Sequence, residues 1–145
     1  MRVRHLTTTA INLHFRFCTL AAIFMLASAP SYATPLLRCM VSYAGSTHII
    51  ESGTTQKPYE VTSVDIDGRF RFKAVMVGAG DRVDYIKLYA YFQTRHNKLP
   101  IHQATYLPPF NPSAAPVKLT PLNSLYAGDV ERELQYQCSL QGVAQ

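Results

Sequence analysis

The chain has 145 residues, of which 14 are basic and 9 acidic, so its formal net charge is +5 at neutral pH. Hydrophobic residues make up 48% of it, including nine tyrosines and seven phenylalanines, which excludes an intrinsically disordered chain because enough apolar surface is present to form a core. This length accommodates one globular domain together with a targeting segment.

The first 33 residues have the three-part layout of a secretory signal peptide. Arg2, Arg4 and Arg16 precede or flank an apolar run of about 11 residues, and a Ser-Tyr-Ala sequence ends at Ala33. The run is shorter than the roughly 20 residues that a membrane-spanning helix requires. We therefore expect cleavage after Ala33, which leaves residues 34–145 as one exported domain, periplasmic or secreted, with no transmembrane segment.

Removal of the signal peptide changes the charge of the protein. Three basic residues and no acidic ones are removed, so residues 34–145 carry 11 basic and 9 acidic side chains, a net charge of +2. A protein this mildly basic is not expected to bind nucleic acid through its overall field, so an anionic partner must be recognised by a local patch.

Two cysteines remain in the exported domain, one near each end. Cys18 lies in the predicted signal peptide, whereas Cys39 and Cys138 form an even pair. Such a pair in an exported protein predicts a structural disulfide, while a redox-active pair would be spaced as C-x-x-C. Closing a loop of about 100 residues stabilises a fold by up to about 4.7 kcal/mol if chain entropy alone is counted.

Alternating apolar and polar residues predict β-strands through most of the domain. The clearest pattern is a hairpin at 69–92 with a glycine-rich turn in its middle. Further strands are expected at 36–43, 47–51, 59–66, 99–107 and 131–140. Prolines bracket the segment 99–107, so we place it at the edge of a sheet, where a missing N–H is tolerated.

Two turns determine which side chains of the hairpin lie opposite each other. A three-residue loop ending at a left-handed Gly68 would place Asp65 opposite Arg69. The glycine-rich turn would place Lys73 opposite Lys87. With these turns the core face comprises Phe70, Phe72, Ala74, Met76, Ile86, Leu88, Ala90 and Phe92.

The segment before the last strand predicts a loop and a helix. Residues 108–119 are rich in proline and predict a long irregular loop. One short helix is expected at 121–127, because Thr120 and Pro121 are suited to begin it and Gly128 to end it. Its apolar face would comprise Leu122, Leu125 and Tyr126.

Six or seven short strands, one short helix and a disulfide between the first and last strands predict an all-β domain. The preferred architecture is a small antiparallel β-sandwich, for which an immunoglobulin-like topology is one possibility, and a small barrel is the alternative. The chain contains no tryptophan and so lacks one hallmark of true immunoglobulin domains.

No motif in the sequence specifies a reaction, a cofactor or a metal. The histidines of the exported domain, His48, His96 and His102, do not occur at a metal-ligand spacing. Residues 44–48 lack the G-x-S-x-G frame of a hydrolase nucleophile. We therefore expect no catalytic residues, no cofactor and no bound metal, and a hydrolase assembled from His96, His102 and scattered acids stays open only as a third hypothesis.

The outer face of the hairpin is the one candidate binding site. It combines cations with tyrosines: Arg69, Arg71, Lys73, Tyr85, Lys87, Tyr89 and Tyr91. As a site, the cations would bind phosphates or carboxylates while the tyrosines stack on sugars or bases. In the competing interpretation, tyrosines are ordinary residues of half-exposed strands and the cations cover them and prevent aggregation.

These observations favour an exported, non-enzymatic binding or structural module of the cell envelope, whose partner would be an envelope protein or an anionic glycan. In size, compartment and disulfide-bonded β structure, the chain is also similar to small periplasmic lysozyme inhibitors. This similarity rests on no shared motif, and it implies a second hypothesis, a secreted inhibitor of lysozymes or proteases.

Overall fold

The computed structural model describes residues 34–143, which form ten β-strands and no helix. The strands are β1 (Leu36–Tyr43), β2 (Ser46–Ser52), β3 (Thr54–Thr55), β4 (Val64–Ile66), β5 (Phe70–Ala79), β6 (Arg82–Gln93), β7 (Lys98–Tyr106), β8 (Val117–Lys118), β9 (Asn123–Ala127) and β10 (Arg132–Gln141). Within this range there is accordingly no helix long and apolar enough to cross a membrane. The predicted signal peptide lies outside the described residues.

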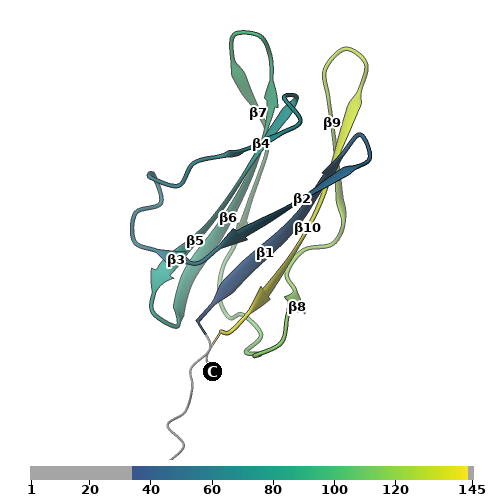
Figure 1. Ribbon diagram of the computed structural model, residues 1–145. Helices are drawn as coiled ribbons and strands as arrows, with labels where there is room; N and C mark the ends of the chain where they lie inside the picture. The colour runs from purple at the N-terminus through teal and green to yellow at the C-terminus, as the bar shows by residue number, and fades with distance from the viewer. Residues whose placement is uncertain (1–33, 144–145) are drawn as a thin grey trace, which may run out of the picture. The chain divides into compact units, whose positions relative to one another are not determined.

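The strands form two sheets that lie face to face (Figure 1). The terminal sheet has the order β2-β1-β10, with β8 and β9 both pairing with the free side of β10. The hairpin sheet has the order β5-β6-β7, with β3 and β4 both pairing with the other side of β5. The sheets do not close into a barrel, and their order differs from the ABED and CFG sheets of an immunoglobulin domain, so neither of those alternatives holds. Strand β7 is an edge strand, as its prolines predicted.

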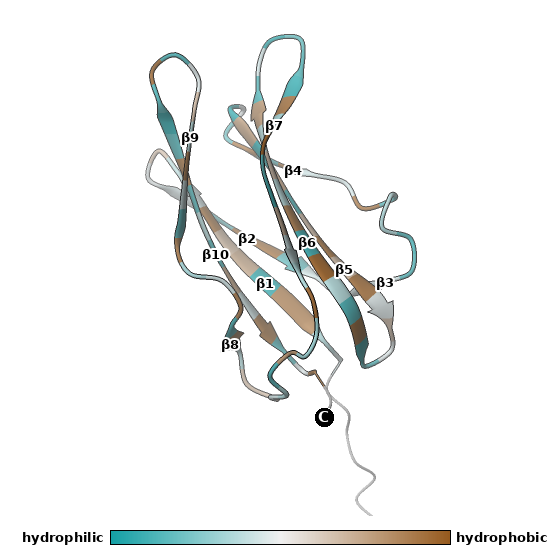
Figure 2. Cartoon of the chain, turned by 180° about the vertical axis from the view of Figure 1, so that it is seen from behind, coloured by the Kyte–Doolittle hydropathy of each residue, from teal (hydrophilic) through white to brown (hydrophobic). Residues whose placement is uncertain are grey.

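One hydrophobic core fills the space between the sheets. Phe72 of the hairpin sheet packs against Tyr136 of the terminal sheet, with ring centroids 5.0 Å apart, and Phe70 packs against Tyr43 at 5.1 Å. Hydrophobic positions recur along β1, β5, β6 and β10 (Figure 2). The predicted core face of the hairpin is confirmed, since all of its residues are buried except Phe92, which packs against the core while partly exposed.

The predicted disulfide is confirmed. Cys39 of β1 and Cys138 of β10 lie directly opposite each other in the terminal sheet and are covalently joined, with their Cα atoms 4.0 Å apart. The bond therefore links two neighbouring strands of one sheet, and both cysteines belong to the core.

The first hairpin loop begins one residue later than predicted. It consists of Asp67, Gly68 and Arg69, so Asp65 lies opposite Arg71. Both Asp67 and Gly68 have positive φ angles, 49° and 66°. Aspartate tolerates this left-handed conformation better than most residues, which permits the shifted loop.

The glycine-rich turn also differs from the prediction. It is a two-residue turn that begins at Gly80, whose φ of 61° suits the first central position of a type II′ turn. A bulge between Val77 and Gly78 precedes it. The hairpin register is therefore displaced by two residues from the expected one.

A displacement of two residues leaves every side chain on its predicted face, because the side-chain period of a strand is two. It changes the cross-strand partners, however. Lys73 lies opposite Tyr89, and Lys87 lies opposite Val75. The observed register thus avoids placing two lysines directly opposite each other, which would be destabilising.

No helix forms at 121–127, so that prediction is wrong. The segment contains β9, which pairs with β10 and places Leu125 opposite Leu134. Leu122 and Tyr126 are mostly exposed instead of packed. Gly128 lies in the turn between β9 and β10. Pairing with the otherwise free side of β10 outweighs the local helix signals, because tertiary context overrides weak intrinsic propensities.

The backbone pairing along one side of β10 is interrupted between β8 and β9. Hydrogen bonds from Thr120 replace it there. The Thr120 side chain is buried, and its hydroxyl accepts a hydrogen bond from the backbone N–H of Cys138 at 3.0 Å and donates one to the carbonyl of Pro121 at 2.8 Å. The carbonyl of Cys138 accepts from the N–H groups of Leu119 and Thr120. A side chain therefore completes the ladder that the backbone leaves open.

Candidate binding face

The outer face of β5 and β6 brings together six of the seven predicted site residues. They point away from the core and are all partly buried: Arg71, Lys73, Tyr85, Lys87, Tyr89 and Tyr91. We call these six residues the basic-aromatic face. Arg69 does not join them, because it lies in the exposed turn before β5, where its carbonyl accepts a hydrogen bond from the backbone of Gln93.

Arg71 is engaged with its own chain. Its Nε donates to the Ser63 hydroxyl at 2.8 Å, one terminal nitrogen donates to the Ser63 carbonyl at 2.6 Å, and the other contacts the Asp65 carboxylate at 3.2 Å. Because the guanidinium is planar and uses all three nitrogens, these contacts fix the position of Ser63 and Asp65 relative to β5 as well as pairing the charge of Asp65. Arg71 therefore fastens the end of the 56–63 loop to the sheet.

Lys73 and Lys87 are positioned beside tyrosine rings. The ammonium of Lys73 lies 6.0 Å from the ring centroid of Tyr89, and that of Lys87 lies 5.6 Å from the ring centroid of Tyr85. These are cation–π distances. Among residues 34–143, neither ammonium has a carboxylate within 4.0 Å. The two lysines thus carry charge that no acid of the described chain neutralises directly.

The tyrosines of the face also contact one another. The rings of Tyr89 and Tyr91 are stacked, with centroids 6.3 Å apart and an angle of 15° between their planes. Burial, aided by the neighbouring Tyr89, raises the pKa of Tyr91 above its usual value. The phenol of Tyr91 therefore remains protonated at neutral pH, and its O–H is available as a hydrogen-bond donor. The ring of Tyr89 is already contacted by Tyr91 and by the Lys73 ammonium. A ligand would therefore contact Tyr89 mainly through its hydroxyl group.

A loop that the sequence did not associate with this face completes it. Pro58 and Tyr59 of the 56–63 loop line one side of a hollow of about 80 Å³, together with Lys73, Val75, Tyr85, Lys87 and Tyr89. Val75 points outward by register yet is only 2% exposed, whereas Tyr59 is 97% exposed. An apolar residue at an outward position of β5 was the one sequence signal that something covers this part of the sheet.

The two sheets differ in charge. Residues 53–107, which form the hairpin sheet, contain eight basic and five acidic residues. The segments 34–52 and 108–143, which form the terminal sheet, contain three basic and four acidic residues. The small net charge of the domain therefore conceals an excess of positive charge on the sheet that bears the basic-aromatic face.

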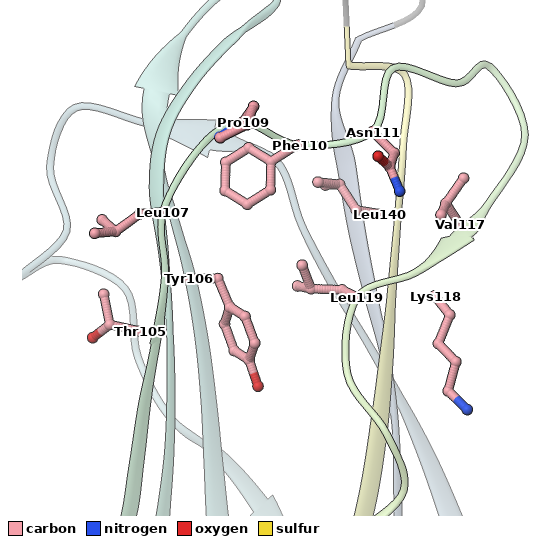
Figure 3. A pocket seen from close by; sticks show the side chains of 10 residues that line it. All are labelled: Thr105, Tyr106, Leu107, Pro109, Phe110, Asn111, Val117, Lys118, Leu119 and Leu140. Carbon is pink, nitrogen blue, oxygen red and sulfur yellow. The ribbon is translucent and has the colours of Figure 1, made fainter.

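A larger hollow lies between the edges of the two sheets, beneath the proline-rich segment. It has a volume of about 380 Å³. Figure 3 shows Leu119 and Leu140 pointing toward Tyr106 and Phe110 across the gap. Phe110 and Leu119 also pack against the core. The proline-rich segment therefore closes the open side of the core. The lining of the hollow offers few charged groups to a ligand.

The three histidines occupy separate parts of the domain. His48 contacts the Asp67 carboxylate at 3.2 Å, and His96 is exposed in the turn between β6 and β7. His102 shares a 2.7 Å hydrogen bond with the hydroxyl of buried Tyr136, and burial lowers the pKa of His102. In the described part of the chain, no three histidine, cysteine, aspartate or glutamate residues converge on a common point.

Comparisons with protein-family models, with curated proteins and with solved structures find no match to this chain. The site must therefore be judged by its chemistry. It offers two lysine ammonium groups and several phenol hydroxyls, all of which can donate hydrogen bonds to an oxyanion.

Proposed function

We propose that this protein is an exported, non-enzymatic β-sandwich module of the cell envelope that binds an anionic partner through the basic-aromatic face. The disulfide supports an oxidising compartment such as the periplasm or the extracellular space. The excess of positive charge on the hairpin sheet supports an anionic partner.

One observation carries the proposal, namely that Lys73 and Lys87 are both placed beside tyrosine rings with no carboxylate partner in the described chain. Surface cations that only maintain solubility are normally extended into solvent or paired with acids. Here both lysines are partly buried within one face. A bound oxyanion would supply the missing counter-charge.

An anionic glycan suits the face better than a protein partner does. Protein interfaces are usually centred on exposed apolar or aromatic anchors that enter a pocket of the partner. The rings of Tyr85, Tyr89 and Tyr91 are only partly exposed, and several of their faces are occupied by neighbouring side chains. Hydroxyl and ammonium donors remain, and these match the hydroxyl and acidic groups of a polysaccharide.

The test is calorimetric binding of the purified, oxidised protein to dextran sulfate and to alginate, with neutral dextran as the control ligand. Charge reversal of both lysines, Lys73→Glu with Lys87→Glu, should lower the affinity at least about tenfold, because charge-assisted contacts are lost and repulsion replaces them. The matched control is Arg95→Glu with Lys98→Glu, which makes the same change of charge in the turn between β6 and β7 and at the first residue of β7. Equal losses in both variants, or no binding by the unmodified protein, would refute the proposal.

The inhibitor hypothesis is tested with a panel of lysozymes and proteases. An inhibitor presents an ordered exposed segment to an enzyme cleft, and the proline-rich segment is held in place through Phe110 and through the hydrogen bond from Gly142 N–H to the Ser113 carbonyl. Inhibition that survives charge reversal of Lys73 and Lys87 would favour this second function over glycan binding.

A further inference from the structure

The hollow between the 56–63 loop and the basic-aromatic face has a mostly polar lining. Five of its seven residues carry polar groups: Tyr59, Lys73, Tyr85, Lys87 and Tyr89. Ammonium groups are donors only, and protonated phenols are donors as well as acceptors. No acidic residue contributes to the lining, and the other two residues, Pro58 and Val75, are apolar. The chemistry of the hollow is therefore that of an oxyanion site.

The size of the hollow limits what it can hold. The hollow is small and partly open to solvent, with a volume of about 80 Å³. One carboxylate, sulfate or phosphate group fits in such a space. The hollow is thus suited to one acidic substituent of a larger molecule.

The charges around the hollow also favour an anion. Lys73 and Lys87 are diagonal neighbours on β5 and β6. The nearest acids of the loop and of β4 are already engaged, since Glu60 contacts Lys57 at 3.0 Å and Asp65 contacts Arg71 at 3.2 Å. An anion bound beside the two lysines would supply the counter-charge that these acids do not.

The wall of the hollow is held before any ligand binds. At the start of the loop, the Thr54 hydroxyl donates to the Gly80 carbonyl at 3.2 Å, and the Lys57 N–H donates to the Thr55 hydroxyl at 3.0 Å. At its end, Arg71 binds Ser63 through two hydrogen bonds. A wall fastened at both ends reduces the conformational entropy lost on binding.

We infer that the hollow lined by Tyr59, Lys73, Tyr85, Lys87 and Tyr89 is a pocket for one oxyanion group, which the acidic substituents of the partner occupy. This inference rests on the proposed function, because it specifies how an anionic glycan is recognised. Selectivity then comes from the acidic group, and the remainder of the polymer lies along the exposed part of the face.

The test is an NMR titration of the oxidised, isotopically labelled protein with sodium sulfate, sodium phosphate and sodium acetate at constant ionic strength. Saturable shifts should be concentrated at Tyr59, Val75 and the backbone around Lys73 and Lys87. Lys73→Gln and Lys87→Gln should each weaken the tightest of the three anions at least about fivefold, whereas the control Lys98→Gln should leave its affinity unchanged. The anion that binds most tightly identifies the preferred group as sulfate, phosphate or carboxylate.

Three outcomes separate this inference from the proposed function. Polysaccharide binding that depends on Lys73 and Lys87, without local shifts by any small anion, would overturn the pocket and leave the binding face standing. Local shifts by a small anion without polysaccharide binding would support the pocket and refute the glycan module. Shifts of equal size around Lys98 and around the hollow would show nonspecific ion association and would also overturn the pocket.

Discussion

Gly78 occupies a position in the hairpin where no other residue fits. A Cβ atom built at this site would lie 2.0 Å from the backbone carbonyl oxygen of Arg82, a distance that only a movement of the backbone would relieve. The bulge, which shifts the hairpin register by one residue, is located at this glycine. The identity of one residue therefore contributes to the alignment of every cross-strand pair on the basic-aromatic face.

We expect Gly78→Ala to lower the free energy of unfolding by about 2 kcal/mol or more, because it forces a clash with backbone atoms. Gly53→Ala is the matched control, since a Cβ there has no neighbour within 4 Å, and its effect should stay within about 0.5 kcal/mol. Urea denaturation of both variants measures the difference. Equal stabilities would show that the hairpin accommodates a side chain at the bulge.

His102 connects the stability of the domain to pH. Burial lowers the pKa of this imidazole below its usual 6.5, so the unfolded chain takes up a proton before the folded protein does as the pH falls. The stabilisation is complete above about pH 7 and is lost as the pH falls through the unfolded pKa toward the lower folded one. The hydrogen bond with the buried Tyr136 holds this partly buried group at the edge of the core.

The substitution His102→Gln should therefore flatten the fall in unfolding free energy between about pH 7 and pH 5, since glutamine does not titrate and can still bond the Tyr136 hydroxyl. Denaturation curves recorded across this range, with the unmodified protein alongside, give the comparison. If the two proteins lose stability in parallel, another group is responsible for the acid sensitivity.

At the scale of elements, the broken edge beside β10 depends on one side chain. The Thr120 hydroxyl accepts a hydrogen bond from the backbone N–H of Cys138, a buried residue that pairs with β1 on one side but with neither β8 nor β9 on the other. Strands β8 and β9 can therefore lie on either side of a gap without leaving that donor unsatisfied.

Thr120→Val should lower the free energy of unfolding by about 1–3 kcal/mol, because it preserves the shape of the side chain and leaves a buried N–H without an acceptor. Thr120→Ser keeps the hydroxyl and serves as the control, and it should retain more stability than the valine variant. Hydrogen exchange at the Cys138 amide should accelerate in the valine variant alone. Comparable stability of Thr120→Val and the unmodified protein would contradict the role given to the hydroxyl.

The elements also show which features were predictable. Alternation in β5 and β6 assigned the core and outer faces correctly, because that pattern depends only on the period of the strand. Partners such as Lys73 and Tyr89 were misassigned, because a bulge before Gly78 and a two-residue turn at Gly80 set the register of β5 and β6. The segment 121–127 was misassigned because its conformation is determined by pairing with β10, and the local sequence does not indicate this contact.

The candidate site was predictable only in part, for a similar reason. The cations and tyrosines of the hairpin share a face by alternation alone. Pro58 and Tyr59 line one side of the hollow at that face, in a loop held by the hydrogen bonds of Arg71 with Ser63, eight residues apart in sequence. No local pattern in the loop indicates this contact. The only indication in the sequence is Val75, an apolar residue at an outward-facing position of β5.

For the whole molecule, the disulfide is the main covalent constraint. It joins residues separated by 99 positions, so it restricts most of the unfolded chain. We expect reduction to lower the free energy of unfolding by about 2–5 kcal/mol. Chemical denaturation of the oxidised and reduced protein measures this difference, and reduced protein is preferable to a Cys39→Ala variant because it retains both sulfur atoms in the core.

The same disulfide has a mechanical consequence. Leu36 pairs with Gln141 at the open end of the β1–β10 ladder, so a force that pulls these two positions apart would unzip the ladder one pair at a time. The pairs Leu37–Leu140 and Arg38–Ser139 would open next, and the covalent bond at Cys39 and Cys138 would then bear the load. Everything between the cysteines, including the basic-aromatic face, would be shielded from tension. A module tethered at both ends could thus be stretched in the envelope while its binding surface kept its shape.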